Sequence, residues 1–169
     1  FLRMVSAAAV DSIQVSGMVT GNDYWIAMDG MRLGTSAASL NMRMIRAGAT
    51  AAASADYNWS SDNTGATDIE VGEGQIRLTG DPIVAARQPS TLAGKLTSLE
   101  IMIPNPMAVV SHNVMCWGGY WSDSNDNAVP INAIGIYTSA AAISAVEFFP
   151  SVGAFAAVGQ ITVRTRARS

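Results

Sequence analysis

The residues best spaced for metal chemistry lie in a polar segment of the chain's last third. Asp123, Asn125 and Asn127 alternate there, which is the spacing at which calcium loops place oxygen ligands around a tight turn. The glycine that such a loop needs at its sixth position is Ala128, however, and its acidic twelfth position is Ile134. We therefore expect a solvated turn and no metal here, with a calcium loop as the alternative.

Acidic residues gather between positions 56 and 73. They are Asp56, Asp62, Asp68, Glu70 and Glu73. Two carboxylates held about 5 Å or about 6.5–9.5 Å apart can cleave glycosidic bonds, but no feature of this spacing brings two of them together. The sequence also has no P-loop, nucleophile elbow or HExxH motif. We therefore expect no enzymatic activity and no cofactor, and place a polysaccharide-cleaving enzyme last among the alternatives.

The only cysteine is Cys116 and the only histidine is His112, so an internal disulfide and a structural zinc site are both excluded. On one face of a strand the two residues would lie about 13 Å apart, at about 3.3 Å per residue, which is too far for a catalytic pair. We expect a small buried cysteine and a half-buried histidine whose hydrogen bonds are satisfied.

Aromatic residues beside Asp, Asn and Gly form a candidate contact surface. Trp59 lies in segment 56–67, which we expect to be a polar loop, while Tyr120 and Trp121 follow a glycine pair. Such side chains can stack on sugar rings, and they are also enriched at protein interfaces. We expect Trp117 in the core and the other three as interface or glycan contacts, or alternatively as caps on that core.

Arginines alternate at the end of the chain, at Arg164, Arg166 and Arg168, so on a strand they share one face. That face could dock on an acidic subunit or capsid surface. Alternatively, the charges only prevent an edge strand from pairing wrongly.

Composition narrows the class of protein. The net charge is −3, which argues against broad nucleic-acid binding. Hydrophobic residues make up 49 % and charged residues only 14 %, against about 25 % in a typical domain. No apolar run approaches the roughly 20 residues that a membrane helix needs, so we expect no membrane insertion. A surface this poor in charge indicates obligate assembly.

The dominant pattern is short segments with period-two alternation, separated by turn residues, which predicts an all-β chain. In residues 39–46, for example, Leu40, Met42 and Met44 share one face. We expect about eight to ten strands in a single antiparallel β-sandwich of jelly-roll type over residues 1–169. Residues 1–11 would be an extended arm or the end of a preceding segment.

The last third carries the most distinctive motif, a strand ending in Phe-Pro-x-x-Gly-x-Phe, then small residues, a glycine and a final strand. This pattern resembles the C-terminal signature of β-sandwich virion proteins of tailed bacteriophages. The matching positions are Phe149, Pro150, Gly153, Phe155, Gly159 and Ile161. Segments 24–28, 40–44 and 99–105 also resemble that family, so the similarity covers most of the chain. The family's Asn-Gly-Asp turn and Leu-Tyr-Gly ending are replaced here by residues 47–50 and 163–165.

Elementary chemistry supports the motif independently. Pro150 has no N–H to donate and should end its strand, and Gly153 can adopt a positive φ in the loop. Phe149 or Phe155 would then plug the open end of the sandwich. Ordinary turn chemistry with ordinary core aromatics is the alternative.

The resemblance implies a structural component of a phage-like virion, namely an appendage or decoration protein docked on the capsid or tail. Because that family often forms trimers, we expect a homotrimer that contacts other virion proteins. The alternative is a receptor-binding module of a tail fibre or spike that recognises host glycan. Either protein would be made in the host cytoplasm and located in the virion.

Overall fold

The protein is described by a computed structural model covering residues 2–5, 9–35, 38–47, 56–63, 66–73, 75–77, 96–122, 128–156 and 159–169. Within these ranges, twelve strands form two sheets. The larger sheet contains, in spatial order, β1 (Leu2–Val5), β12 (Gln160–Ala167), β3 (Asn22–Met31), β8 (Thr97–Ile103), β9 (His112–Trp121), β10 (Ala128–Tyr137), β5 (Tyr57–Asn63) and β6 (Ala66–Glu73). The smaller sheet contains β2 (Ile13–Ser16), β11 (Ile143–Pro150), β4 (Leu40–Arg46) and β7 (Ile76–Arg77).

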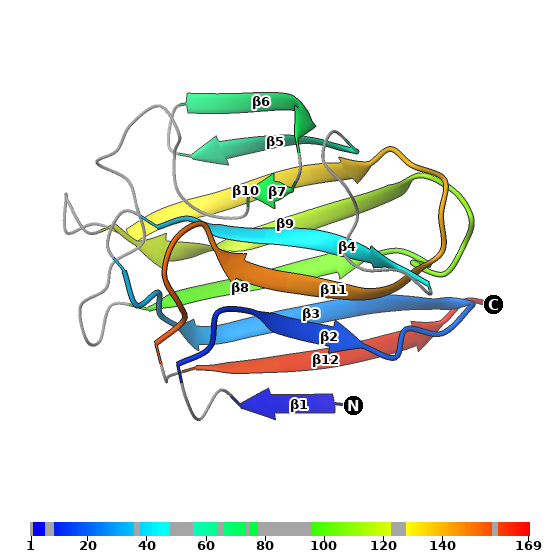
Figure 1. Cartoon of the computed structure of the whole chain (residues 1–169), viewed down its shortest axis with the longest axis horizontal. Coiled ribbons are helices and arrows are strands. Elements are labelled where there is room, and N and C mark those ends of the chain that lie inside the picture. The colour runs from blue at the N-terminus through cyan, green and yellow to red at the C-terminus, as the bar shows by residue number, and fades with distance from the viewer. Residues whose placement is uncertain are drawn as a thin grey trace.

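All strand pairings are antiparallel, and the two sheets stack as layers (Figure 1). The described residues include no helix. The described part of the chain is therefore an antiparallel β-sandwich of jelly-roll type, as the alternation predicted. It contains more strands than the eight to ten expected, because β1 and β5 formed where an arm and a loop were expected. Residues 2–5 of the expected arm pair with β12 as an edge strand.

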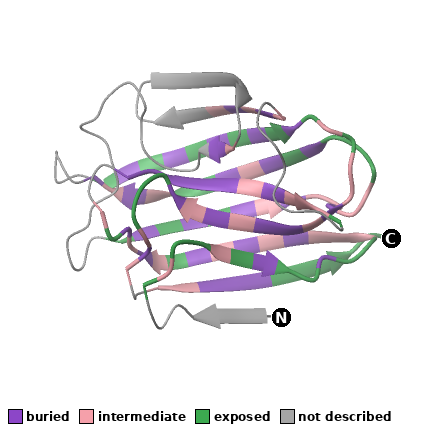
Figure 2. Cartoon of the chain, in the orientation of Figure 1, coloured by how far each residue is buried: buried purple, intermediate pink, exposed green. Residues whose placement is uncertain are grey.

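The core lies between the sheets and follows directly from period-two alternation. On β3, Tyr24, Ile26 and Met28 are buried, while the residues between them face outward. Met42 and Met44 of β4 close the core from the smaller sheet, on the face that the sequence predicted. Figure 2 shows the resulting alternation of buried and exposed positions along the strands.

The expectation of a polar loop over residues 56–67 is wrong, because this segment contributes two strands, β5 and part of β6. β5 pairs with β10, and Tyr57 and Trp59 point into the core at 0 % and 4 % exposure. Their polar neighbours Asn58 and Ser60 alternate with them and are half-buried. The many Ser, Asn and Asp residues favoured the interpretation as a loop, although a strand that buries only alternate side chains can carry polar residues at the others.

The residues of the Phe-Pro-x-x-Gly-x-Phe motif lie at and after the end of β11. Pro150 is the last residue of β11, as expected, and Gly153 and Gly159 have φ of 73° and 94°. Phe155 is fully buried and its backbone bridges Val10 and Leu33, which fits both the expected plug and the alternative of an ordinary core aromatic. Phe149 instead lies half-buried, with the Arg43 guanidinium 4.7 Å above its ring centre.

Gly118 allows β8 and β9 to approach closely. Its φ is 147°, and a Cβ placed there would lie 2.3 Å from the backbone oxygen of Ser98 and 2.8 Å from the Cα of Leu99. Both contacts are with backbone atoms, which cannot rotate away. The β8–β9 register therefore requires a residue without a side chain at this position.

We predict that Gly118→Ala lowers the free energy of unfolding by about 2–4 kcal/mol, because it combines backbone strain with a steric clash. Urea denaturation measures this loss. Gly17→Ala is the matched control, since Gly17 also has a positive φ but an added Cβ would meet no atom within 4 Å. The control should cost about 1–2 kcal/mol, the conformational penalty alone. Equal losses for both variants would contradict the clash.

Candidate binding surface on the outer face of the larger sheet

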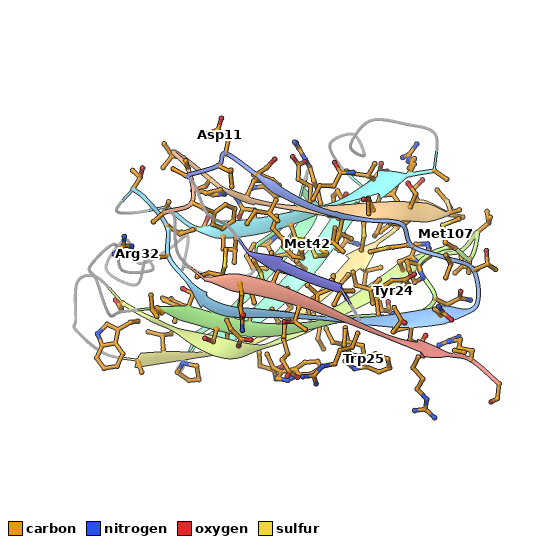
Figure 3. The ribbon with its side chains drawn as sticks, turned by 90° about the horizontal axis from the view of Figure 1, so that it is seen from below. Asp11, Tyr24, Trp25, Arg32, Met42 and Met107 are labelled. Atoms are coloured by element: carbon orange, nitrogen blue, oxygen red, sulfur yellow. The ribbon has the colours of Figure 1, made fainter. Side chains whose placement is uncertain are left out.

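The outer face is the side of the larger sheet turned away from the smaller sheet. Figure 3 shows Trp25 on this side, opposite Met42 of the smaller sheet. The strand registers align outward residues in rows across the sheet. One row runs from Arg164 of β12 through Trp25, Met102 and Met115 to Ile134 of β10.

One half of this face carries what we call the β9–β10 apolar patch, formed by Met115, Trp117, Ile134 and Ile136. Ile134 is 52 % exposed, and Trp117 and Ile136 are each 38 % exposed. Met115 lies directly opposite Ile134 in the β9–β10 register. Large apolar side chains that remain exposed together on a regular sheet are typical of a surface that another molecule covers.

The other half contains a concavity of about 280 Å³, which we call the β12–β3–β8 hollow. It is lined by Trp25, Ala27, Glu100, Arg164 and Arg166. Ala27 lies between Thr162 on β12 and Glu100 on β8, so its small side chain leaves the space open. Trp25 forms one wall.

The charges around the hollow have no partners within the described chain. Arg164, Arg166 and Glu100 are exposed, and no described residue hydrogen-bonds or ion-pairs with their side chains. Arg168, expected to act with the first two arginines, differs. It follows the end of β12, and its Nε donates to Asp23 Oδ1 at 2.6 Å. Arg168 therefore anchors the chain end, and only two of the three arginines share the outer face.

The structure corrects the predicted aromatic contacts. Trp59 and Tyr120 are buried, at 4 % and 2 % exposure, because their positions in β5 and β9 face the core. They therefore cannot contact a glycan or a neighbouring subunit on the surface of this chain. Trp117, expected in the core, is the exposed member, because it alternates with buried Cys116. Trp121 is half-buried and lines a shallow hollow together with Gly118 and Gly119.

Sequence reasoning missed Trp25. The signal was present, since Trp25 alternates with Tyr24 and Ile26, whose face is buried. A tryptophan on the opposite face of the same strand has to point outward.

The remaining polar candidates have structural roles. His112 is buried rather than half-buried, and its Nε2 lies 2.7 Å from the carbonyl oxygen of Ala141. Cys116 is buried as expected, and burial raises the pKa of its thiol to about 12, which keeps it protonated and unreactive. Asp56 forms an ion pair with Arg46 at 2.8 Å. The hydrogen bond from Arg46 to the Tyr137 hydroxyl is the main cause that raises the pKa of Arg46.

In the backbone register of β5 and β6, none of the other acidic candidates lies directly opposite another. Asp62 lies opposite Thr67, Asp68 opposite Ser61, and Glu70 opposite Trp59. The calcium candidates Asp123, Asn125 and Asn127 lie outside the described residues. Within the described ranges, no group of three His, Cys, Asp or Glu residues is placed to hold a metal ion, and no helix could span a membrane.

Comparison with known proteins identifies no relative by sequence. No protein-family model matches the chain, and no curated protein resembles it. Among solved structures, it is similar to the crystal structure of alginate lyase A1-II′, a member of polysaccharide lyase family 7, with 12 % identity and a TM-score of 0.28. The similarity covers 92 % of this chain and 66 % of the lyase chain, so the chain spans just under two thirds of that protein. A TM-score this low carries no argument about function.

An ion pair on the outside of the smaller sheet makes stability depend on pH. Arg43 Nε donates to Glu147 Oε2 at 2.5 Å, and Glu147 is 15 % exposed. Burial alone would raise the pKa of Glu147. Hydrogen bonds from Arg43 and Ser12, together with the charge of Arg43, outweigh burial and hold this pKa below its usual value of 4.5.

Because the folded-state pKa is lowered, the stabilisation from Glu147 is present above pH 4.5 and is lost as the pH falls through the folded-state value. We predict that wild type is more stable than Glu147→Gln at pH 7 and that this difference shrinks below about pH 4.5. Urea denaturation from pH 7 to pH 3 measures it. Glu100→Gln controls for the loss of one negative charge. A constant difference between wild type and Glu147→Gln across the range would contradict the prediction.

Proposed function

We propose that this chain is a non-catalytic structural module of a phage-like virion that assembles with copies of itself. The observation that carries the proposal is the β9–β10 apolar patch, where Ile134, Trp117 and Ile136 remain exposed on a regular sheet. Fully burying one such side chain contributes about 1.5–3 kcal/mol, so covering these half-exposed residues favours association. The low proportion of charged residues, 14 %, and the phage-like terminal motif support the same function.

The available area suits a subunit contact. Five adjacent strands, β8, β9, β10, β5 and β6, form the half of the sheet around the patch. At about 4.8 Å between strands and about 3.3 Å per residue, this half measures about 24 Å by about 30 Å, or about 700 Å². A standard interface uses about 800 Å² per partner. We propose a homotrimer that docks on a capsid or tail protein of the particle.

The assembly is tested by light scattering coupled to size-exclusion chromatography. We predict the mass of three chains for wild type and a shift to monomer for Ile134→Glu, because a buried unpaired carboxylate opposes association. Val152→Glu is the matched control, since Val152 is 53 % exposed in the loop after β11, against 52 % for Ile134, and lies outside the patch. The control should remain trimeric. A stable wild-type monomer at micromolar concentration would contradict self-assembly.

The location is tested by cryo-electron microscopy of the assembled particle. Many copies over the shell would identify a decoration or head appendage, and a few copies at the tail a tail component. Absence of the chain from the particle would overturn the virion function.

A second candidate function, recognition of host glycan by a tail fibre or spike, is favoured by the β12–β3–β8 hollow.

A further inference from the structure

We propose that the β12–β3–β8 hollow binds an acidic saccharide, with the acid group held by Arg164 and Arg166 and the sugar ring held against Trp25. The proposal goes beyond assembly, because Trp25, Arg164 and Arg166 lie on β3 and β12, outside the five strands around the β9–β10 apolar patch. Glu100 on β8 borders both surfaces, since it lies opposite Trp117 in the β8–β9 register. It follows from the shape of the hollow, its aromatic wall and its unpartnered charges.

The arginine pair provides the anion-binding element. Arg164 and Arg166 are two residues apart on β12 and share its outward face, about 6.6 Å apart along the strand. A guanidinium donates two parallel hydrogen bonds to a carboxylate or a similar acid group. Arg43, Arg46 and Arg168 each already form an ion pair with an acidic residue, whereas Arg164 and Arg166 form none with any described residue. Their donors are therefore available to a ligand.

Glu100 narrows the class of ligand. It borders the hollow from β8, directly across from Ala27, and its carboxylate only accepts hydrogen bonds. A polyanion such as nucleic acid would be repelled there, whereas sugar hydroxyls would donate to it. The pattern of cationic groups on one side and an acceptor on the other therefore fits one acid group attached to a hydroxyl-rich ring.

Trp25 and the size of the hollow provide the remaining recognition. Trp25 is half-buried and lines the hollow, to which its indole contributes apolar surface. A sugar ring has an apolar C–H face that packs on such a surface. The volume of about 280 Å³ lies just below the range of about 300–1,000 Å³ typical of ligand pockets, which suits one or two sugar rings.

The test is a titration of the full-length protein, followed by nuclear magnetic resonance of the tryptophan indole groups. The acidic probes are trigalacturonate, a glucuronate-containing disaccharide and sialyllactose; the neutral probe is lactose. We expect at least one acidic probe to shift the Trp25 signal with saturation, and lactose to bind at least tenfold more weakly. No saturable shift with any acidic probe at millimolar concentration would overturn the proposal.

Variants locate the site. Arg164→Gln should weaken binding about ten- to a hundredfold, the effect of losing a charge-assisted hydrogen bond. Ala27→Leu should abolish binding by filling the hollow without changing any charge. Arg32→Gln removes the same charge outside the hollow, beyond the end of β3, and Figure 3 shows Arg32 well away from Trp25. That control should bind as wild type does. Unchanged affinity in Ala27→Leu would overturn the assignment to this hollow.

Two further measurements separate this proposal from its competitors. A tetraglutamate peptide is titrated in parallel, and binding equal to that of the best saccharide would overturn saccharide recognition in favour of an acidic protein partner. Ile134→Glu, designed to prevent assembly, should bind the saccharide as wild type does. Loss of saccharide binding in this variant would overturn the independence of the hollow from the subunit contact.

Discussion

The structure depends on one constraint, which is that an eight-stranded sheet buries one face against a sheet of four strands. Side chains alternate along a strand, so β3 must present Trp25 and Ala27 outward in order to turn Tyr24 and Ile26 inward. The smaller sheet covers the inner face only. Packing within the described chain therefore leaves Ile134 and Trp117 of the outer face exposed, and the proposed subunit contact would cover them.

The alternation of apolar and polar residues predicted the class of fold and most strands, because this pattern can be recognised from consecutive residues alone. It failed in residues 56–67, where polar residues dominate and only Tyr57 and Trp59 reveal the buried face. It also placed Trp117 in the core and Tyr120 on the surface, whereas the structure shows the opposite. In β9 the buried Cys116 and Tyr120 are an even number of residues apart and face the core, while Trp117 faces outward. The hollow could not be predicted locally, since it requires Ala27 to lie between Thr162 and Glu100, which are distant in the sequence.

The charges divide into two groups with different consequences. Arg43, Arg46 and Arg168 pair with acidic residues that are distant in the sequence or lie on a neighbouring segment, and these pairs hold strands and the chain end together. Each acidic partner is less exposed than its arginine, so removing the arginine would leave a partly desolvated carboxylate. Arg164 and Arg166 have no such role among the described residues. Their guanidinium groups are therefore available to the ligand proposed for the hollow.

The two halves of the outer face also differ in the kind of contact they favour. The β9–β10 apolar patch would lose unfavourable hydration on association, which suits a permanent neighbour. The β12–β3–β8 hollow is walled by side chains on hydrogen-bonded strands rather than on loops, so its shape exists before a ligand arrives. Such preorganisation reduces the entropy lost on binding, which allows a small ligand to bind there with few contacts. The proposed subunit contact and the proposed ligand site therefore occupy neighbouring parts of one sheet that meet at β8, where Glu100 lies opposite Trp117.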